Sequence, residues 1–235
     1  MFFENSPNVK YINNIDINKW CATEPFSSTA RIYDDSVIVI DLSTASGLPY
    51  VLDMFDKYKQ EGYTYPVSRS GLSNLEDNQV GSTRLCTNSQ VLANYIDDAI
   101  RNSDALPQMY GKYKYEGVSS YFRFMKYEKG GMHYPHYDSD YVYQVSKNHI
   151  TKMSMVMYFT DCNTGEIAFI NDKTVHSQDR SDWERQATDN EIWLKVKPKA
   201  GRIVIFPHTL CHSVLEYKED FCRVMVRGDL IYSKG

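Results

Sequence analysis

Two potential metal ligands stand two residues apart in the segment GGMHYPHYDSDY at residues 130–141. His136 and Asp138 would point to the same face of a β-strand, because successive side chains alternate between the two faces. A third ligand must come from elsewhere, and His212 follows the apolar run of GRIVIFPHTLCHSV at residues 201–214. Two imidazoles and one carboxylate on one side of an ion leave coordination positions open for other molecules.

A second histidine offers an alternative for the third ligand. His208 precedes His212 by four residues, so a helix over this stretch would present both imidazoles to one ion. Pro207 and the β-branched run before it instead favour the end of a strand followed by a turn. We therefore expect His212, rather than His208, to complete the set, which would be typical of a non-haem Fe(II) oxygenase.

The other candidate ligands near the motif have simpler interpretations. His133 and Asp140 lie close enough to line the rim of a pocket, or to orient a ligating imidazole through a hydrogen bond. His149 and His176 stand in polar surroundings, which predicts contact with solvent. The HxD tripeptide is weak evidence by itself, because it arises often by chance and polar pairs on strands are usually solvated.

Two more side chains near these motifs deserve notice, and one of them could bind an anion. Arg223 follows His212 by eleven residues on the last expected strand, where a guanidinium could bind a carboxylate through two hydrogen bonds. Tyr127 ends the strand before the HxD motif, and Gly130 and Gly131 permit a tight return of the chain. The alternatives are a solvent-exposed strand arginine and a tyrosine of the core.

The elements that would position these side chains begin with a mixed region. SVIVID at residues 36–41 predicts a strand, and apolar residues at helical spacing predict a helix over residues 49–58. A second helix is expected after a cap at Ser89, ending near Asn102. Residues 62–87 are rich in Ser, Gly and Asn, which favours a long loop near a functional face.

Beyond about residue 118 the apolar period changes from helical to alternating. The expected strands are residues 120–127, 152–160, 166–170, 192–197, 202–206 and 223–232. A charged segment at residues 171–191 is expected to form a mobile loop over a site. We predict an α+β, mainly β architecture, in which a helical N-terminal part packs on a β-sandwich or barrel.

The domain organisation predicted from these patterns is simple. Residues 1–35 would form an N-terminal arm that is at most partly ordered. Residues 36–235 would form one domain, helical to about residue 117 and all-β from about residue 118. At 235 residues, such a chain lies within the size range of a single β-rich domain.

The composition disfavours several partners and compartments. A net charge of -4 and an isoelectric point near 5.9 supply no overall basic field for a nucleic acid. No stretch has the length and apolarity of a membrane span or the pattern of a targeting peptide, so we expect a cytoplasmic protein. The cysteines are scattered without CxxC spacing, which predicts reduced thiols: Cys21, Cys86, Cys162, Cys211 and Cys222.

These motifs together resemble the 2-oxoglutarate and Fe(II)-dependent dioxygenases, and among them the prolyl-4-hydroxylase-like group. The most specific stretch is FMKYEKGGMHYPHYDSDY at residues 124–141, which looks like that group's tyrosine, YxxG turn and P-H-Y-D iron motif. The segments at residues 198–214 and 222–232 are similar to its closing region of a distal histidine, a basic residue and an R-x-D strand. GEIAF at residues 165–169 looks like a reduced GGxTxF motif, and STRLC at residues 82–86 like an R-x-S region. The similarity covers roughly residues 30–232.

The resemblance implies both the fold and the roles of the site residues. The core would be a double-stranded β-helix (jelly-roll) with N-terminal helices packed on one sheet. His136, Asp138 and His212 would bind Fe(II), and Arg223 and Tyr127 would bind the distal carboxylate of 2-oxoglutarate. O2 would be the other co-substrate, and L-ascorbate could stimulate the enzyme. The basic position is Arg here, where many relatives have Lys, which preserves the charge.

The reaction implied is hydroxylation of a C–H bond, with succinate and CO2 as co-products. Asp138 keeps a carboxylate where the halogenating branch of the superfamily has a small residue, which favours hydroxylation. The expected substrate is a prolyl or other amino-acid residue in a peptide or protein, and the alternative is a free amino acid or small metabolite. A non-enzymatic alternative is a jelly-roll metal-binding or sensor protein. GEIAF lacks the second Gly and the Thr of its motif, which leaves substrate contacts open.

Overall fold

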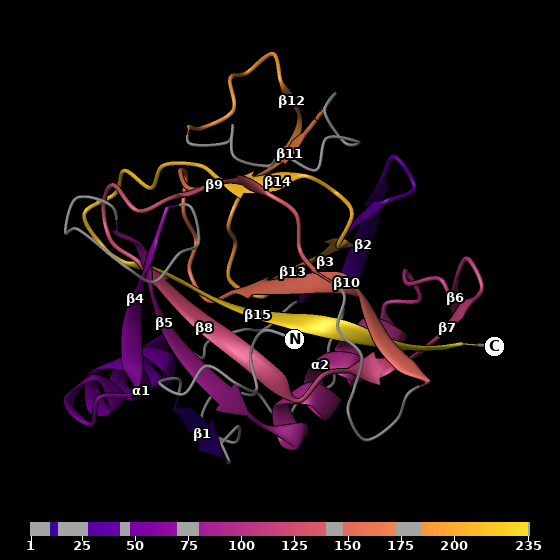
Figure 1. The fold of residues 1–235 in the computed structure, drawn as a ribbon, viewed down its shortest axis with the longest axis horizontal. Helices are drawn as coiled ribbons and strands as arrows, with labels where there is room; N and C mark the ends of the chain where they lie inside the picture. Colours follow the sequence, from indigo (N-terminus) through magenta and orange to yellow (C-terminus); the bar gives the residue numbers. More distant parts are fainter. Residues whose placement is uncertain are drawn as a thin grey trace.

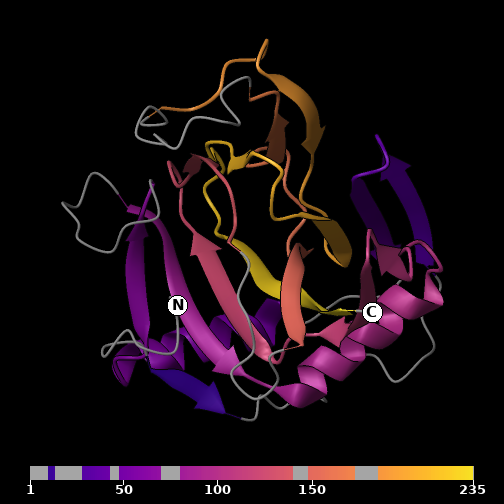
Figure 2. The same ribbon diagram turned by 45° about the vertical axis from the view of Figure 1, so that its right-hand side comes forward.

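The computed structural model describes residues 10–13, 28–42, 48–69, 80–139, 148–172 and 185–234. Within this part of the chain, two β-sheets face each other, and two helices cover the outer side of the larger sheet (Figure 1). A view turned by 45° shows both helices on the side opposite to the smaller sheet (Figure 2). The predicted α+β, mainly β architecture is confirmed.

The larger sheet has eleven strands, and most of them follow one continuous path. In spatial order this path is β1 (Tyr11–Asn13), β5 (Val80–Asn88), β8 (Tyr121–Tyr127), β15 (Arg223–Lys234), β10 (His149–Tyr158), β13 (Arg202–Pro207), β3 (Val37–Leu42) and β2 (Ser28–Tyr33). Three strands pair beside the path: β4 (Thr64–Ser68) with β5, β7 (Tyr113–Val118) with β15, and β6 (Met109–Tyr110) with β7.

The smaller sheet has four strands and provides the opposite wall of the core. Their spatial order is β12 (Ile192–Val196), β11 (Ile167–Ile170), β14 (His212–Val214) and β9 (His133–His136). Neighbours in this sheet come from distant parts of the sequence. For example, β14 pairs with β9 in the antiparallel direction. Two facing sheets of this kind, with helices outside, form the jelly-roll arrangement that the family resemblance implied.

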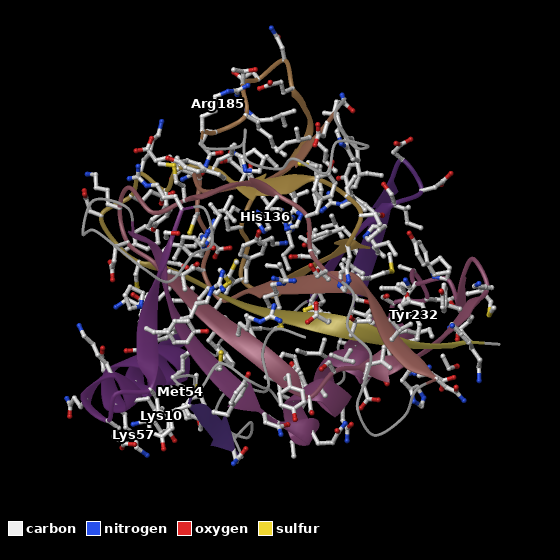
Figure 3. The ribbon with its side chains drawn as sticks, viewed as in Figure 1. Lys10, Met54, Lys57, His136, Arg185 and Tyr232 are labelled. Carbon is white, nitrogen blue, oxygen red and sulfur yellow. The ribbon has the colours of Figure 1, made fainter. Side chains whose placement is uncertain are left out.

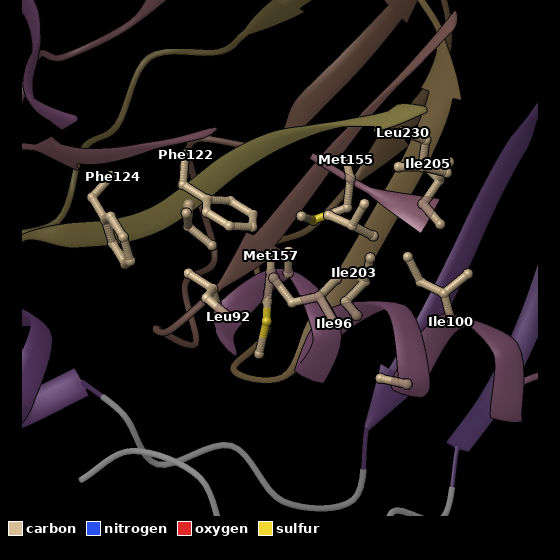
Figure 4. Packing of buried hydrophobic residues seen from close by; sticks show 14 of the residues in the cluster. Leu92, Ile96, Ile100, Phe122, Phe124, Met155, Met157, Ile203, Ile205 and Leu230 are labelled. Carbon is tan, nitrogen blue, oxygen red and sulfur yellow. The ribbon is translucent and has the colours of Figure 1, made fainter. Parts of the chain in front are cut away.

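The helices α1 (Leu48–Gln60) and α2 (Gln90–Asn102) pack on the outer face of the larger sheet. The Ser89 hydroxyl caps α2 by accepting a hydrogen bond of 3.3 Å from the backbone N–H of Leu92. Leu92, Ile96 and Ile100 are fully buried and form one stripe of this helix. Figure 4 shows the stripe against the apolar side chains of the sheet. The second helix was thus predicted correctly, including its cap.

The central strands of the larger sheet are buried on both faces, which divides their side chains into two cores. On β13, Ile203 and Ile205 point to the helices, whereas Val204 and Phe206 point to the smaller sheet. A strand with two buried faces has no polar side, so β13 reads as a continuous apolar run rather than an alternation. The inner core, between the sheets, is the one that adjoins the candidate site.

The prediction of a long loop over residues 62–87 is wrong in the described part, where the chain forms β4 and β5. Its Gly, Ser and Asn residues disfavour a strand locally, but β5 gains partners on both sides, β4 and β8. A side chain at Gly81 would place its Cβ 2.4 Å from the Met132 carbonyl oxygen. The glycine therefore permits close contact between two backbones.

Other predictions compare with the structure as follows. The six expected strands after residue 118 correspond to β8, β10, β11, β12, β13 and β15. Residues 173–184 of the expected mobile loop lie outside the described residues. Residues 1–35 contain β1 and β2, which join the larger sheet; the division into an arm and one domain stays a prediction. No helix among the described residues is long and apolar enough to cross a membrane.

Candidate metal centre

The structure brings together the three side chains that the sequence singled out as metal ligands. His212 on β14 lies directly opposite His136 on β9, and their ring centroids are 4.3 Å apart. Asp138 follows the end of β9, and its Oδ2 atom lies 3.6 Å from His212 Nε2. One ligand atom of each residue lies within 4.8 Å of the others. Figure 3 shows His136 between the two sheets.

Backbone carbonyls fix the orientation of both imidazoles. His136 Nδ1 lies 2.8 Å from the Tyr134 carbonyl oxygen, and His212 Nδ1 lies 3.0 Å from that of Leu210. A carbonyl oxygen only accepts hydrogen bonds, so each Nδ1 must carry the proton. The lone pair is then on Nε2 of each ring, which is the atom a metal would bind.

Asp138 has two polar partners besides the imidazoles. The Ser154 hydroxyl donates a hydrogen bond to Oδ2, and the Arg227 guanidinium lies 2.7 Å from Oδ1. Burial opposes ionisation of Asp138, but Arg227 and the two imidazoles outweigh it and lower the pKa of this carboxyl. The carboxylate is therefore ionised at neutral pH, although its side chain is only 4% exposed.

The protonation states of the group fit a divalent transition metal. Burial lowers the pKa of His212 to about 3, and burial also lowers the pKa of His136. Both imidazoles are therefore neutral at pH 7, and they stand next to an ionised carboxylate. Two neutral nitrogen donors and one oxygen anion with open positions are the donor set of non-haem Fe(II) sites.

Arg223 and Tyr127 lie against each other in the inner core. The Arg223 guanidinium carbon lies 3.9 Å from the centroid of the Tyr127 ring, and one guanidinium nitrogen donates to the Gly165 carbonyl oxygen. Both side chains are fully buried. In the described part of the chain, Arg223 Nε and the Tyr127 hydroxyl make no hydrogen bond of normal geometry, and the Ser82 hydroxyl near Tyr127 is bonded to His133. Unpaired buried polar atoms are costly, and these two would fit a bound carboxylate.

The remaining candidate ligands have other partners. His133 Nε2 lies 3.0 Å from the Ser82 hydroxyl, and His208 Nε2 lies 3.3 Å from Asp229 Oδ1. Burial lowers the pKa of His133, which is therefore neutral. Backbone carbonyls, rather than His133, orient the two imidazoles of the centre. Asp140 and His176 lie outside the described residues.

The sequence interpretation missed several polar residues of the inner face. Ser154 binds Asp138 directly, and a buried acceptor, Asp229, lies 3.6 Å from Arg227 and 3.7 Å from Arg123. The alternation on β15 could have revealed this set, since Arg223, Arg227 and Asp229 share a face at even spacing. Arg84 of β5 also lies on this face, opposite Met125 of the inner core. Its position could not have been predicted, because residues 62–87 were expected to form a loop.

Comparisons with known proteins agree with this geometry. Residues 122–228 match the model of the 2OG-Fe(II) oxygenase superfamily. A prolyl hydroxylase from Trichoplax adhaerens, solved with a hypoxia inducible factor oxygen degradation domain peptide fragment, aligns over 86% of this chain and 84% of its own, with a TM-score of 0.53 and 13% identity. No curated protein matches the sequence significantly.

Two other solved structures align over most of the chain. The non-heme alpha ketoglutarate dependent epimerase SnoN from nogalamycin biosynthesis covers 85% of this chain and 76% of its own, with a TM-score of 0.50 and 12% identity. A Pseudomonas putida prolyl-4-hydroxylase covers 88% of this chain and 93% of its own, with a TM-score of 0.49 and 14% identity.

A hydroxylase and an epimerase thus share this fold, so the fold by itself does not decide the reaction. The segment that matches the superfamily model contains His136, Asp138, His212, Arg223 and Tyr127. The predicted resemblance to the 2OG-Fe(II) oxygenase superfamily is confirmed for residues 122–228, and the chain shares its fold with a solved prolyl hydroxylase.

Proposed function

We propose that this protein is a dioxygenase that uses Fe(II), 2-oxoglutarate and O2 to hydroxylate an unactivated C–H bond. One observation carries the proposal: two neutral imidazoles from neighbouring strands present Nε2 atoms beside an ionised carboxylate, in a segment of the 2OG-Fe(II) oxygenase superfamily. When bound, ferrous iron and 2-oxoglutarate supply the oxidising chemistry, with succinate and CO2 as co-products.

In this proposal His136, Asp138 and His212 hold the iron. The carbonyls of Tyr134 and Leu210 keep both imidazoles in the tautomer that can bind a metal. Ser154 and Arg227 stabilise the ionised form of Asp138. A carboxylate at that position favours hydroxylation over halogenation, because the halogenating branch of the superfamily has a small residue there.

Arg223 and Tyr127 are proposed to bind the distal carboxylate of 2-oxoglutarate. A buried guanidinium is favourable where it meets an anion, and Arg223 Nε has a hydrogen to donate. The Tyr127 hydroxyl likewise makes no hydrogen bond of normal geometry with any described residue, although the Tyr127 ring, rather than its hydroxyl, contacts Arg223. Burial raises the pKa of Tyr127, so the phenol stays protonated and can donate to a carboxylate.

The proposed substrate is a prolyl or other amino-acid residue in a peptide or protein. The Trichoplax adhaerens neighbour was solved with a peptide, which supports this class of substrate. A hydroxylase of a free amino acid or small metabolite is the alternative, and it would show turnover on that compound and none on peptides. A metal-binding or sensor protein would take up metal without forming succinate. Stimulation by ascorbate remains a prediction of the family resemblance.

An anaerobic titration tests the proposed centre. Fe(II) and 2-oxoglutarate are added to wild-type protein, to His136→Ala and to His149→Ala, and the visible charge-transfer band of the chelate is recorded. We expect the band in wild type and in His149→Ala, whose altered histidine lies on β10 outside the centre, but not in His136→Ala. Absence of the band from wild type would refute the proposal.

Product analysis then separates an enzyme from a sensor. After O2 is admitted, the enzyme forms succinate, and the rate rises when a true substrate is present. Wild-type protein that shows the band but forms no succinate with peptides, free amino acids or small metabolites would instead support the metal-binding or sensor function.

A further inference from the structure

Three arginines from three neighbouring strands share the inner face of the larger sheet. Arg227 on β15 lies directly opposite Arg123 on β8. Arg84 on β5 lies opposite Met125 of β8, two residues from Arg123 and therefore on the same face. Met125 packs in the inner core between the two sheets. The three guanidinium groups therefore belong to the wall that adjoins the candidate metal centre.

Such an arrangement of like charges is unfavourable unless anions balance it. The described part of the chain supplies two carboxylates here. Asp229 lies within 3.7 Å of both Arg123 and Arg227, and Asp138 lies 2.7 Å from Arg227. Asp138 is also a proposed iron ligand, so its charge would be shared with the metal. Among the described residues, three guanidinium groups thus face two carboxylates.

Arg84 carries the unbalanced charge. It makes no hydrogen bond or ion pair with any other described residue, and its Nε atom is buried without a partner. Burial lowers the pKa of Arg84, and the charges of Arg123 and Arg227 lower it further. The two phenols that interact with Arg84, Tyr65 and Tyr127, supply no negative charge, because burial raises the pKa of both.

We propose that Arg84, Arg123 and Arg227 bind a carboxylate of the substrate, next to the C–H bond that reacts. This inference rests on the proposed function and adds a class of substrate to it. The site adjoins the iron centre, because Arg227 contacts Asp138. Arg227 lies four residues from Arg223 of the proposed 2-oxoglutarate site, about 13 Å along the strand. Arg84 lies nearer to that site, opposite Met125 and two residues from Tyr127, so a titration with 2-oxoglutarate has to separate the two sites. The carboxylate is either the α-carboxylate of a free amino acid or an acidic side chain in a peptide.

Two matched pairs of compounds distinguish these sources. L-Proline and L-prolinamide differ only at the α-carboxylate, and acetyl-Glu-Pro-Gly-amide and acetyl-Gln-Pro-Gly-amide differ only at the side chain. Binding of each compound is measured by calorimetry under anaerobic conditions, on protein loaded with Fe(II) and 2-oxoglutarate. Within at least one pair, we expect the carboxylate to bind at least about tenfold more tightly than the amide, as for a hydrogen bond between charged groups. The pair that shows this preference identifies the source.

Three variants test whether Arg84 is responsible. Arg84→Gln should remove the preference for the carboxylate, Arg84→Lys should retain much of it, and Arg101→Gln should leave it unchanged. Arg101 is a suitable control because it lies on α2, on the outer side of the sheet, where it pairs with Asp97. Thermal unfolding of each variant checks that it is folded, and Arg84→Lys tests the charge itself if Arg84→Gln does not fold.

The anaerobic charge-transfer band separates failure of this site from failure of the proposed function. The band should form with the same 2-oxoglutarate affinity in wild type and in Arg84→Gln. Equal binding of carboxylate and amide, a preference that survives Arg84→Gln, or no binding of any of the four compounds to protein that shows the band would overturn the carboxylate site. A loss of 2-oxoglutarate affinity in Arg84→Gln would also overturn it, because Arg84 would then belong to the co-substrate site.

Discussion

At the scale of single residues, the inner face of this protein uses buried arginines for different purposes. Arg227 holds a carboxylate of the candidate iron centre, whereas Arg223 stacks on an aromatic ring and keeps unpaired donor capacity. A buried guanidinium is costly without an anion, so each unpaired donor indicates where a ligand belongs. Substitution of Arg223 should therefore change the affinity for 2-oxoglutarate, and substitution of Arg227 should change the candidate iron centre.

Arg223→Ala should weaken 2-oxoglutarate binding and leave Fe(II) affinity largely unchanged. A hydrogen bond to a charged group contributes about 1.5–3 kcal/mol, so the dissociation constant should rise roughly 10- to 100-fold. Arg223→Lys keeps the positive charge and should lose less. The anaerobic charge-transfer band, titrated with each component in turn, gives both affinities. Equal loss of Fe(II) and 2-oxoglutarate binding would show that Arg223 supports the metal centre.

Gly165 offers an independent test of the Arg223 position. A Cβ atom at Gly165 would lie 2.9 Å from an Arg223 guanidinium nitrogen and 3.2 Å from the Tyr217 ring, and the glycine has a φ of +74°. Gly111 has a similar φ of +59°, with nothing within 4 Å of its Cβ position. Both alanine variants should lose about 1 kcal/mol of stability from backbone strain. Gly165→Ala alone should also weaken 2-oxoglutarate binding, as measured by the same titration.

At the scale of elements, the outer layer supports the sheet without touching the site. Ile96 of α2 is fully buried, whereas Val91 of the same helix is 56% exposed. Ile96→Ala should cost about 2–5 kcal/mol in the free energy of unfolding, and Val91→Ala should change it by less than about 0.5 kcal/mol. Denaturant unfolding measures both. The charge-transfer band of folded Ile96→Ala should match wild type, and loss of the band would mean that α2 shapes the centre.

The edge formed by β2, β3 and β13 should give a pH-dependent stability. Arg202 binds Asp41 through two contacts of 2.7 and 2.8 Å, and this hydrogen bonding lowers the pKa of Asp41. A lowered pKa stabilises the folded state above the unfolded value of about 4, and the contribution is lost as the pH falls through the folded pKa. Asp41→Asn should therefore cost about 1 kcal/mol near neutral pH.

The cost of Asp41→Asn should shrink as the pH is lowered below about 4. Urea unfolding at a series of pH values measures the difference from wild type. Asp189→Asn is the control, since Asp189 pairs with Lys195 at the surface, where its side chain is 87% exposed. A difference for Asp41→Asn that stays constant down to acid pH would contradict the assigned ion pair.

At the scale of the whole molecule, metal binding should stabilise the fold. The three proposed ligands converge only when β9 and β14 are paired, so the unfolded chain offers no comparable site. A ligand at 100 times its dissociation constant adds about 2.7 kcal/mol to stability, which for a chain of this size raises Tm by roughly 5–10 °C. Calorimetry with and without Fe(II), under anaerobic conditions, should show this rise in wild type but not in His136→Ala. The same rise in both would place the metal elsewhere.

Much of the site and fold could be predicted because the signals were local. The types and spacing of His136 and Asp138, the position of His212 after an apolar run, and the alternation of the last strand all lie within short segments. The second helix carried its own cap and apolar stripe. Hydrophobic period, capping and turn residues act between near neighbours, so they can be interpreted one segment at a time.

The tertiary structure alone decided which segments meet. It made β5 a strand despite its turn-rich sequence, because pairing with β4 and β8 outweighs local preference. It set Arg84 and Arg227 on one wall and placed the Tyr127 ring, rather than its hydroxyl, against Arg223. The register between distant strands depends on the whole core, and no single segment contains it. The sequence thus determined which chemical groups were available, and the packing of two sheets determined which of them face each other.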